Sequence, residues 1–281
     1  MKPIVPRIAA VHDMSCFGRC SLSVIMPVLS CMGLQVCPLP TAIFSTHLGG
    51  FTDIAYCDLT QRLEDFFNHW HQEKITFDCL YSGFLASEQQ IEIVSHFIDK
   101  FSGNLPLVLV DPVMGDEGKL YSVYTATMQV QMKKLICKAD IITPNFTEAG
   151  FLLGEQYQAA VEHKDFLKEW LIRLAGFGPS MVVITGIPVA ENTLLNMGYE
   201  KSSGCFFEVA SDYVPANYPG TGDIFASVLI GALLQGKRLP AAMQQAAEFV
   251  ALCVQTTFAA RTPPREGVLL ELALFSLCKG E

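Results

Sequence analysis

Short apolar, β-branched runs alternate with longer segments of helical spacing, and this alternation constrains the fold most strongly. The runs predicted as strands cover residues 7–11, 35–39, 79–84, 107–113, 139–143 and 181–186. Several of them are apolar at nearly every position, which is typical of parallel strands covered on both faces. The segments predicted as helices lie between them, at 59–72, 88–101, 123–137 and 162–175. Right-handed crossovers between such units predict a doubly wound α/β sheet.

The pattern changes after Gly186. Residues 193–200 and 204–210 flank Lys201-Ser-Ser203 and predict an antiparallel hairpin at one edge of the sheet. A loop follows, and then two long apolar helices predicted over 224–235 and 240–260. Because no linker or low-complexity stretch divides the chain, we expect a single domain over residues 1–281.

The composition excludes several classes of protein. Hydrophobic residues make up 51% of the chain and charged residues only 17%, against a usual charged share of about 25%. Disorder is excluded, because such a chain can bury enough surface to offset its conformational entropy. The low charge predicts a broad buried sheet, a subunit interface, or both. The net charge is −9 and the basic residues are scattered, whereas a nucleic-acid binder needs a basic stripe.

Residues 20–46 carry no charge, but Pro27, Pro38 and Pro40 interrupt them. A membrane span needs about 20 mostly apolar residues in one helix, so we interpret this stretch as a buried helix followed by a buried strand. The N-terminus has no signal-peptide pattern. The ten cysteines form no C-x-x-C pair. These features predict a cytoplasmic protein with reduced cysteines and no membrane association.

In doubly wound sheets, ligands bind beyond the carboxyl ends of the strands. The residues just after each predicted strand are therefore candidates for the chemistry: His12-Asp13, 45–49, Gly83-Phe84, 111–115, 143–148 and Thr185-Gly186.

The most informative motif is Gly220-Thr221-Gly222-Asp223, which is followed directly by an apolar run. The two glycines allow a close backbone approach, and the free amides and dipole of the following helix favour an anion. This predicts a site for a transferring phosphoryl group, with Asp223 taking the proton of the attacking hydroxyl. The alternative is that Asp223 only caps the helix and the glycines form a turn.

Two further motifs carry carboxylates. Asp111 begins Asp-Pro-Val-Met-Gly115, and Glu148 follows Thr143-Pro-Asn145 near the start of the next helix. A carboxylate above a phosphate site commonly holds Mg²⁺, directly or through water. The alternatives are an acidic surface turn for the first motif and a helix-dipole role for Glu148. His12 and His47 also follow strands, and ordinary hydrogen-bonded histidines are the alternative for both.

Other nucleotide and hydrolase motifs are missing from the sequence. It contains no G-x-x-x-x-G-K-[ST], no G-x-G-x-x-G after a strand, no G-x-S-x-G and no H-E-x-x-H. A nicotinamide-dependent oxidoreductase on the same type of sheet is therefore disfavoured, because it lacks its glycine fingerprint.

Taken together, the motifs resemble the pyridoxal kinase group of the ribokinase-like superfamily over nearly the whole chain. The matching segments, in chain order, are FSTH (44–47), SGF (82–84), DPVMGDEGKLY (111–121), DIITPNFTEA (140–149), VVITG (182–186) and GTGD (220–223). The resemblance implies a ribokinase-like, mostly parallel sheet with helices on both faces. It also implies ATP-dependent phosphorylation of the 5′-hydroxymethyl group of a vitamin B6 vitamer, in salvage of pyridoxal 5′-phosphate.

The resemblance also implies residue roles. Asp223 matches the catalytic base, and Gly220, Thr221 and Gly222 match the anion hole. Residues that match positions around ATP are Asp111, Tyr121, Thr143, Glu148 and Thr185, with the hairpin 193–210 and the loop after it over the nucleotide. Asp111 and Glu148 would hold Mg²⁺ through water. Family members often use a monovalent cation such as K⁺ as well, and they usually pair as homodimers through a sheet face or edge.

The substrate end departs from this pattern. The positions expected to contact the substrate, besides Asp223, are Asp13, Ser45, His47, Leu48 and Phe84. Asp13 stands where these kinases usually have a serine, Leu48 where a threonine is usual, and Phe84 replaces a common tyrosine. A carboxylate at position 13 favours a protonated ring nitrogen or an amine, which points to pyridoxamine or an aminopyrimidine. Two alternatives therefore stay open: a hydroxymethylpyrimidine kinase of thiamine synthesis, and a non-catalytic ligand-binding relative.

Overall fold

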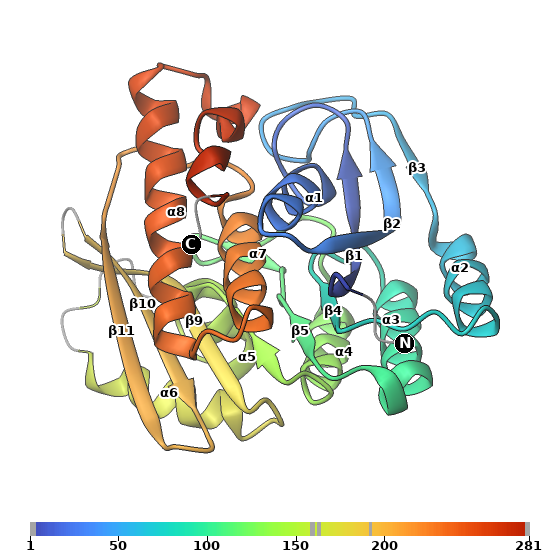
Figure 1. Ribbon diagram of the computed structural model, residues 1–281. Coiled ribbons are helices and arrows are strands. Elements are labelled where there is room, and N and C mark those ends of the chain that lie inside the picture. The colour runs from blue at the N-terminus through green and yellow to red at the C-terminus, as the bar shows by residue number, and fades with distance from the viewer. Residues whose placement is uncertain (1–3, 158–160, 162–163, 191–192, 279–281) are drawn as a thin grey trace.

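The computed structural model describes residues 4–157, 161, 164–190 and 193–278. Within them, nine strands form one sheet in the order β11-β10-β9-β8-β5-β4-β1-β2-β3 (Figure 1). The parallel strands are β1 (Arg7–Ser15), β2 (Gln35–Phe44), β4 (Cys79–Ser82), β5 (Val108–Val110), β8 (Ile141–Ile142) and β9 (Met181–Ala190). The antiparallel strands are β10 (Thr193–Glu200) and β11 (Cys205–Asp212) at one edge and β3 (Tyr56–Asp58) at the other. The predicted fold class and the predicted edge hairpin are confirmed.

Helices cover both faces of the sheet (Figure 1). On one face lie α1 (Leu22–Cys31), α7 (Thr221–Leu234) and α8 (Leu239–Ala259), together with the short turns η2 (Pro264–Glu266), η3 (Leu270–Leu272) and η4 (Leu274–Ser276). On the other lie α2 (Thr60–Gln72), α3 (Glu88–Phe101), α4 (Ala126–Ile136), α5 (Phe146–Leu153) and α6 (Asp165–Ala175), with the turn η1 (Ser102–Asn104) after α3. Each face has its own cluster of buried apolar side chains, so the sheet separates two hydrophobic cores.

Local sequence signals explain where several helices begin. Ser87 accepts a hydrogen bond from the amide of Gln90 at the start of α3, and Thr125 does the same for Met128 at the start of α4. Such caps satisfy amides that have no partner inside the helix. In contrast, α7 is buried on all sides along most of its length, which is typical of a helix enclosed between a sheet and a second helix.

Several boundaries differ from those predicted. β1 continues to Ser15, so His12 and Asp13 lie within the strand and not after it, while β5 already ends at Val110. α7 begins at Thr221, three residues earlier than predicted, with Gly220 as its N-cap. The edge strand β3 and the hairpin of β6 (Gly115–Asp116) and β7 (Lys119–Leu120) have no counterpart in the sequence prediction. Residues 162–163 of the predicted helix 162–175 lie outside the described residues.

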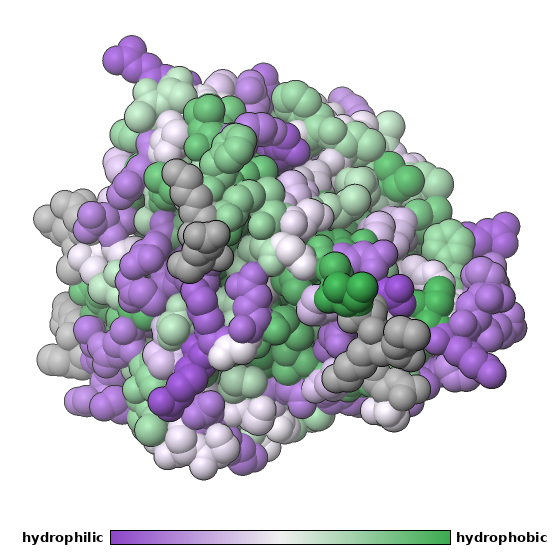
Figure 2. All heavy atoms as spheres, in the orientation of Figure 1, coloured by the Kyte–Doolittle hydropathy of each residue, from purple (hydrophilic) through white to green (hydrophobic). Residues whose placement is uncertain are grey.

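The surface of the α1, α7 and α8 side is uneven in polarity. Apolar side chains gather over the upper half of this view, and the regions of β11 and α2 are mostly hydrophilic (Figure 2). The broad buried sheet accounts for part of the apolar composition, and the predicted subunit interface remains a prediction. In the described part of the chain, none of the helices has the length and apolar character that crossing a bilayer requires.

Candidate active site

The parallel register brings the predicted strand-end residues into one row. Val11 pairs with Ser82, Ser82 with Val110, Val110 with Ile142, and Ile142 with Val182. The residues that follow these pairs, among them Asp111 and Thr143, therefore emerge along the same edge of the sheet. This is the edge at which doubly wound sheets bind ligands.

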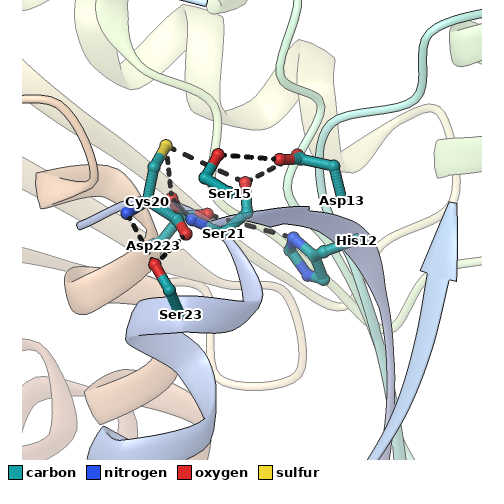
Figure 3. A network of polar contacts seen from close by, with 7 residues as sticks. All are labelled: His12, Asp13, Ser15, Cys20, Ser21, Ser23 and Asp223. Carbon is teal, nitrogen blue, oxygen red and sulfur yellow. Dashed lines mark hydrogen bonds and ion pairs between the residues drawn. The ribbon is translucent and has the colours of Figure 1, made fainter. Parts of the chain in front are cut away.

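Asp223 lies in the first turn of α7 and faces the end of β1 (Figure 3). Its Oδ2 accepts a hydrogen bond from the amide of Ser21 at 2.8 Å, and the Cys20 thiol is 3.5 Å away. Its side chain is 11% exposed, so the carboxylate is mostly enclosed and still reachable. Burial, together with the nearby charge of Asp13, raises the pKa of Asp223 to about 6. The alternative that Asp223 caps the helix does not describe this geometry, because Gly220 is the N-cap.

The start of α7 presents open amides. Gly220 has φ +86°, and the first amide bonded within the helix is that of Ile224, which donates to the Gly220 carbonyl at 3.0 Å. The amides of Thr221, Gly222 and Asp223 precede it and have no partner inside the helix. A Cβ on Gly220 would lie 2.2 Å from the carbonyl oxygen of Arg19, so only glycine fits there. The geometry is that of an anion site at a helix N-terminus.

Asp111, Thr143 and Glu148 form a second polar group. Glu148 is part of a capping box with Asn145: its Oε2 accepts from the Asn145 amide at 2.8 Å, and its Oε1 accepts from the Met114 amide at 3.1 Å. Glu148 therefore caps the start of α5, and its proposed place in a metal site stays a prediction. Asp111 and Glu148 are both buried, and the Thr143 hydroxyl beside Asp111 makes no hydrogen bond of normal geometry to the described residues.

The pKa values of the Asp111 and Glu148 carboxyl groups are both raised. Burial raises the pKa of Asp111 to about 8, and the charge of Asp223 adds to this shift. The pKa of Glu148 is also raised, by burial first and by Asp111 second. Among the described residues, no group of three or more His, Cys, Asp or Glu side chains is placed to hold a metal ion. Mg²⁺ bound through one or two carboxylates, waters and phosphates fits this arrangement, and it would neutralise the buried negative charge.

These pKa shifts predict how stability depends on pH. An unfolded aspartate has a pKa of about 3.9, whereas burial raises the pKa of folded Asp111 to about 8. The folded state therefore binds more protons between these values, and stability should fall as the pH rises through this interval. We expect the Tm in EDTA to fall between pH 5 and pH 8, by a smaller amount in Asp111→Asn. Parallel curves for the two proteins would contradict the shift at Asp111.

The expected substrate side chains do not all lie together. Asp13 is buried, and its carboxylate accepts hydrogen bonds from Ser21 Oγ at 2.7 Å and from Ser15 Oγ at 3.3 Å (Figure 3). His47 is also buried, but both ring nitrogens contact backbone, the Arg265 carbonyl at 2.7 Å and the Gly49 amide at 3.1 Å. This is the hydrogen-bonded arrangement given above as the alternative, with His47 holding its loop.

The remaining predicted residues differ in exposure. Ser45 is exposed and its hydroxyl accepts from the Ala55 amide at 3.1 Å. Leu48 and Tyr121 are exposed, and Phe84 is half-buried. Thr185 lies in β9, with its amide bonded to the Pro144 carbonyl at 3.0 Å.

His12 is buried next to Asp223, with its Nδ1 3.9 Å from Oδ1. Its ring makes an edge contact with Tyr81 at 4.3 Å between centroids, and neither nitrogen has a hydrogen-bond partner among the described residues. Burial lowers the pKa of His12 to about 3, so the imidazole is neutral. A Cβ on Gly83 would lie 2.2 Å from this ring, which explains the glycine of the Ser-Gly-Phe motif.

Ser21 and the contact of Cys20 with Asp223 were not predicted from the sequence. Both contacts join residues about 200 positions apart in the chain, and no spacing rule connects such positions. The positive φ of Ser21 is likewise invisible in the sequence.

A groove of about 390 Å³ lies between the edge hairpin and α8. Its lining residues are Thr193, Ala210, Ser211, Asp212, Gln244, Ala247, Glu248, Ala251 and Gln255. The first residue of β10 and the last residue of β11 pair beside Ala190, the last residue of β9. The groove therefore lies at the carboxyl-terminal ends of the parallel strands, as do the other site residues. The groove borders the hairpin that the resemblance implies to lie over the nucleotide, and that role stays a prediction.

Comparison with known proteins identifies the family. The family model for phosphomethylpyrimidine kinase matches residues 29–264. The chain belongs to this family. A pyridoxal kinase of Arabidopsis thaliana is 30% identical over 239 residues, which are 81% of this chain and 73% of that protein. The resemblance to the pyridoxal kinase group of the ribokinase-like superfamily is thereby confirmed.

Crystal structures of family relatives agree with the fold. One, from Bacteroides thetaiotaomicron, was provisionally assigned as a phosphomethylpyrimidine kinase and crystallised with pyridoxal. It is 43% identical, with a TM-score of 0.93, and the match covers 97% of this chain and 96% of that one. The pyridoxal kinase of Lactobacillus plantarum is 30% identical with a TM-score of 0.89, covering 98% and 97%.

Proposed function

We propose that this protein is an ATP-dependent kinase that phosphorylates the 5′-hydroxymethyl group of a vitamin B6 vitamer in salvage of pyridoxal 5′-phosphate. The observation that carries the proposal is the placement of Asp223 beside the open amides of α7. The family relatives give the substrate class, since a 43% identical relative was crystallised with pyridoxal. The proposal includes a single-domain, cytoplasmic homodimer, and light scattering on the purified protein would test the dimer.

The proposed mechanism follows from the positions of these residues. The substrate oxygen attacks the γ-phosphorus of ATP in line, the bond from that phosphorus to the β,γ-bridging oxygen breaks, and ADP leaves. Asp223 accepts the hydroxyl proton. The amides of Gly220 to Asp223 hold the developing negative charge of the phosphoryl group. Mg²⁺, when bound, supplies charge neutralisation at the phosphates, and Asp111 and Glu148 are the residues proposed to hold it through water.

The nucleotide is proposed to extend from the α7 amides along the sheet edge to the groove beside α8. Tyr121, Thr143 and Thr185 are the remaining residues proposed to surround it. The buried hydroxyl of Thr143 lies beside Asp111 and makes no hydrogen bond of normal geometry to the described residues, and it is proposed as one oxygen ligand of a monovalent cation such as K⁺.

Measuring ADP release with a panel of alcohols tests the proposed function. Pyridoxal, pyridoxine, pyridoxamine, hydroxymethylpyrimidine and ribose should be compared at equal concentration with Mg²⁺ and ATP. We expect the highest kcat/KM on a vitamer. The family model favours hydroxymethylpyrimidine as the second candidate, and a higher kcat/KM on it would overturn the vitamer assignment. No turnover of any alcohol would support the non-catalytic alternative.

Asp13 is proposed to select the substrate through its charge. Its carboxylate is buried among serine hydroxyls, where a cationic group on the substrate would interact strongly. We expect Asp13→Asn to lower kcat/KM on pyridoxamine about 10-fold or more, which corresponds to losing a hydrogen bond to a charged group, and to change pyridoxal much less. Ser45, Leu48 and Phe84 are the other side chains proposed to contact the substrate. An equal small change on pyridoxal, pyridoxamine and hydroxymethylpyrimidine would refute the selecting role.

A further inference from the structure

Ser21 lies between the two carboxylates of the candidate site. Its hydroxyl donates to Asp13 Oδ1 at 2.7 Å, and its backbone amide donates to Asp223 Oδ2 at 2.8 Å. Figure 3 shows both bonds leaving the same residue, with Cys20 and His12 beside it. Ser21 is 3% exposed, so these contacts are shielded from bulk water. A single residue therefore connects the proposed substrate-binding group to the proposed base.

The conformation of Ser21 is unusual for its place in the fold. It is the N-cap of α1, and its carbonyl accepts from the amides of Val24 and Ile25 at 2.9 and 3.0 Å. An N-cap serine normally has extended backbone angles, and its hydroxyl accepts from an amide of the first turn. Ser21 instead has φ 53° and ψ −132°, and its side chain makes no capping bond. The hydroxyl donates to Asp13 and does not cap the helix.

This backbone conformation is strained. A non-glycine residue in such a sparsely populated region costs about 1–3 kcal/mol and persists only where the surroundings hold it in place. The surroundings here are tight, because Gly220 packs against the backbone of Arg19 and Cys20. Ser23 bonds both the amide and the carbonyl of Cys20, at 3.1 and 2.7 Å. The strain therefore coincides with the geometry that directs both donors of Ser21 to the carboxylates.

We propose that Ser21 is the positioning residue that links Asp13 to Asp223, so that substrate binding at Asp13 and the orientation of the base are set together. This inference rests on the proposed function and extends it. The other titratable groups that face the pair are His12 on β1, Tyr81 on β4, Asp111 after β5, Cys20, and His47 after β2.

Two substitutions separate this role from a structural one. Ser21→Gly removes the hydroxyl, keeps the amide and suits the backbone conformation. Ser21→Ala removes the same hydroxyl and keeps the strain. We expect Ser21→Gly to be the more stable variant by Tm. Both variants should lose kcat/KM on the preferred vitamer to the same extent, about 10-fold, mainly through a higher KM, because the amide still holds Asp223. Activity that follows stability, with Ser21→Gly near wild type, would overturn the inference.

A double-mutant cycle with Asp13→Ala gives the second test. If the Ser21 hydroxyl acts through Asp13, Ser21→Gly should change kcat/KM by less than twofold in the Asp13→Ala background. Additive losses would show that Ser21 does not act through Asp13 and would contradict the link. Wild-type protein that phosphorylates none of the tested alcohols would instead overturn the proposed function, so the two failures are distinguishable.

Discussion

Replacement of Asp223 by Asn or Ala should lower kcat by about 10²- to 10⁴-fold, the usual contribution of a general base. The carboxylate is the only group of this residue that can accept the hydroxyl proton, and Asn keeps its size and its bond with the Ser21 amide. ATP affinity should change little, because the amides of α7 belong to the backbone. The ADP-release assay gives kcat, and calorimetric titration with Mg-ATP gives the affinity.

Asp65→Asn is a matched control, because Asp65 is an exposed aspartate on α2 that pairs with exposed Arg62 and is not among the proposed site residues. The wild-type pH profile adds an independent check. With a pKa of about 6, Asp223 is protonated and inactive at lower pH, so kcat/KM should decline as the pH falls below 6. Near-normal turnover in Asp223→Asn would remove this residue from the proposed role.

Gly220→Ala should strongly reduce both stability and turnover. The residue has φ +86°, and the new methyl group would lie 2.2 Å from the Arg19 carbonyl oxygen. Removing this steric clash requires α7 to move away from the segment that contains Arg19 and Ser21. Overpacking of this kind costs about 1–3 kcal/mol, and a displacement of about 1 Å at reacting groups can cost about 10²-fold in rate. Urea unfolding and the ADP-release assay measure the two effects.

Gly236→Ala is the control for backbone conformation. Gly236 follows α7 with φ +88°, nearly the angle of Gly220, but no atom lies within 4 Å of a Cβ placed there. It should lose only about 1–2 kcal/mol through the left-handed conformation, with kcat near wild type. Equal stability losses for the two variants would mean that the contact with Arg19 has no measurable effect.

Predictions from the sequence were most accurate where the signal is local. Helix α3 has the predicted bounds, because an N-cap serine precedes a clear apolar periodicity. The Gly-Thr-Gly-Asp motif also lies at a helix start, as predicted, since glycine and the following apolar run determine that geometry locally. Short pairings were missed: β3 and the β6–β7 hairpin are three residues long or less, too short for a period to appear.

The order of strand and helix signals along the chain was enough to predict the parallel sheet. It also predicted where ligands bind and which carboxylates lie there, because the carboxyl ends of all parallel strands in such a sheet lie on the same side. Tertiary structure decided which side chains meet at that edge. It directs His47 to backbone, brings Ser21 between Asp13 and Asp223, and places Cys20 against the latter. The contacts of Ser21 and Cys20 depend on the packing of α1 against α7 and on the strained backbone of Ser21, and neither property is encoded in a local pattern of residues.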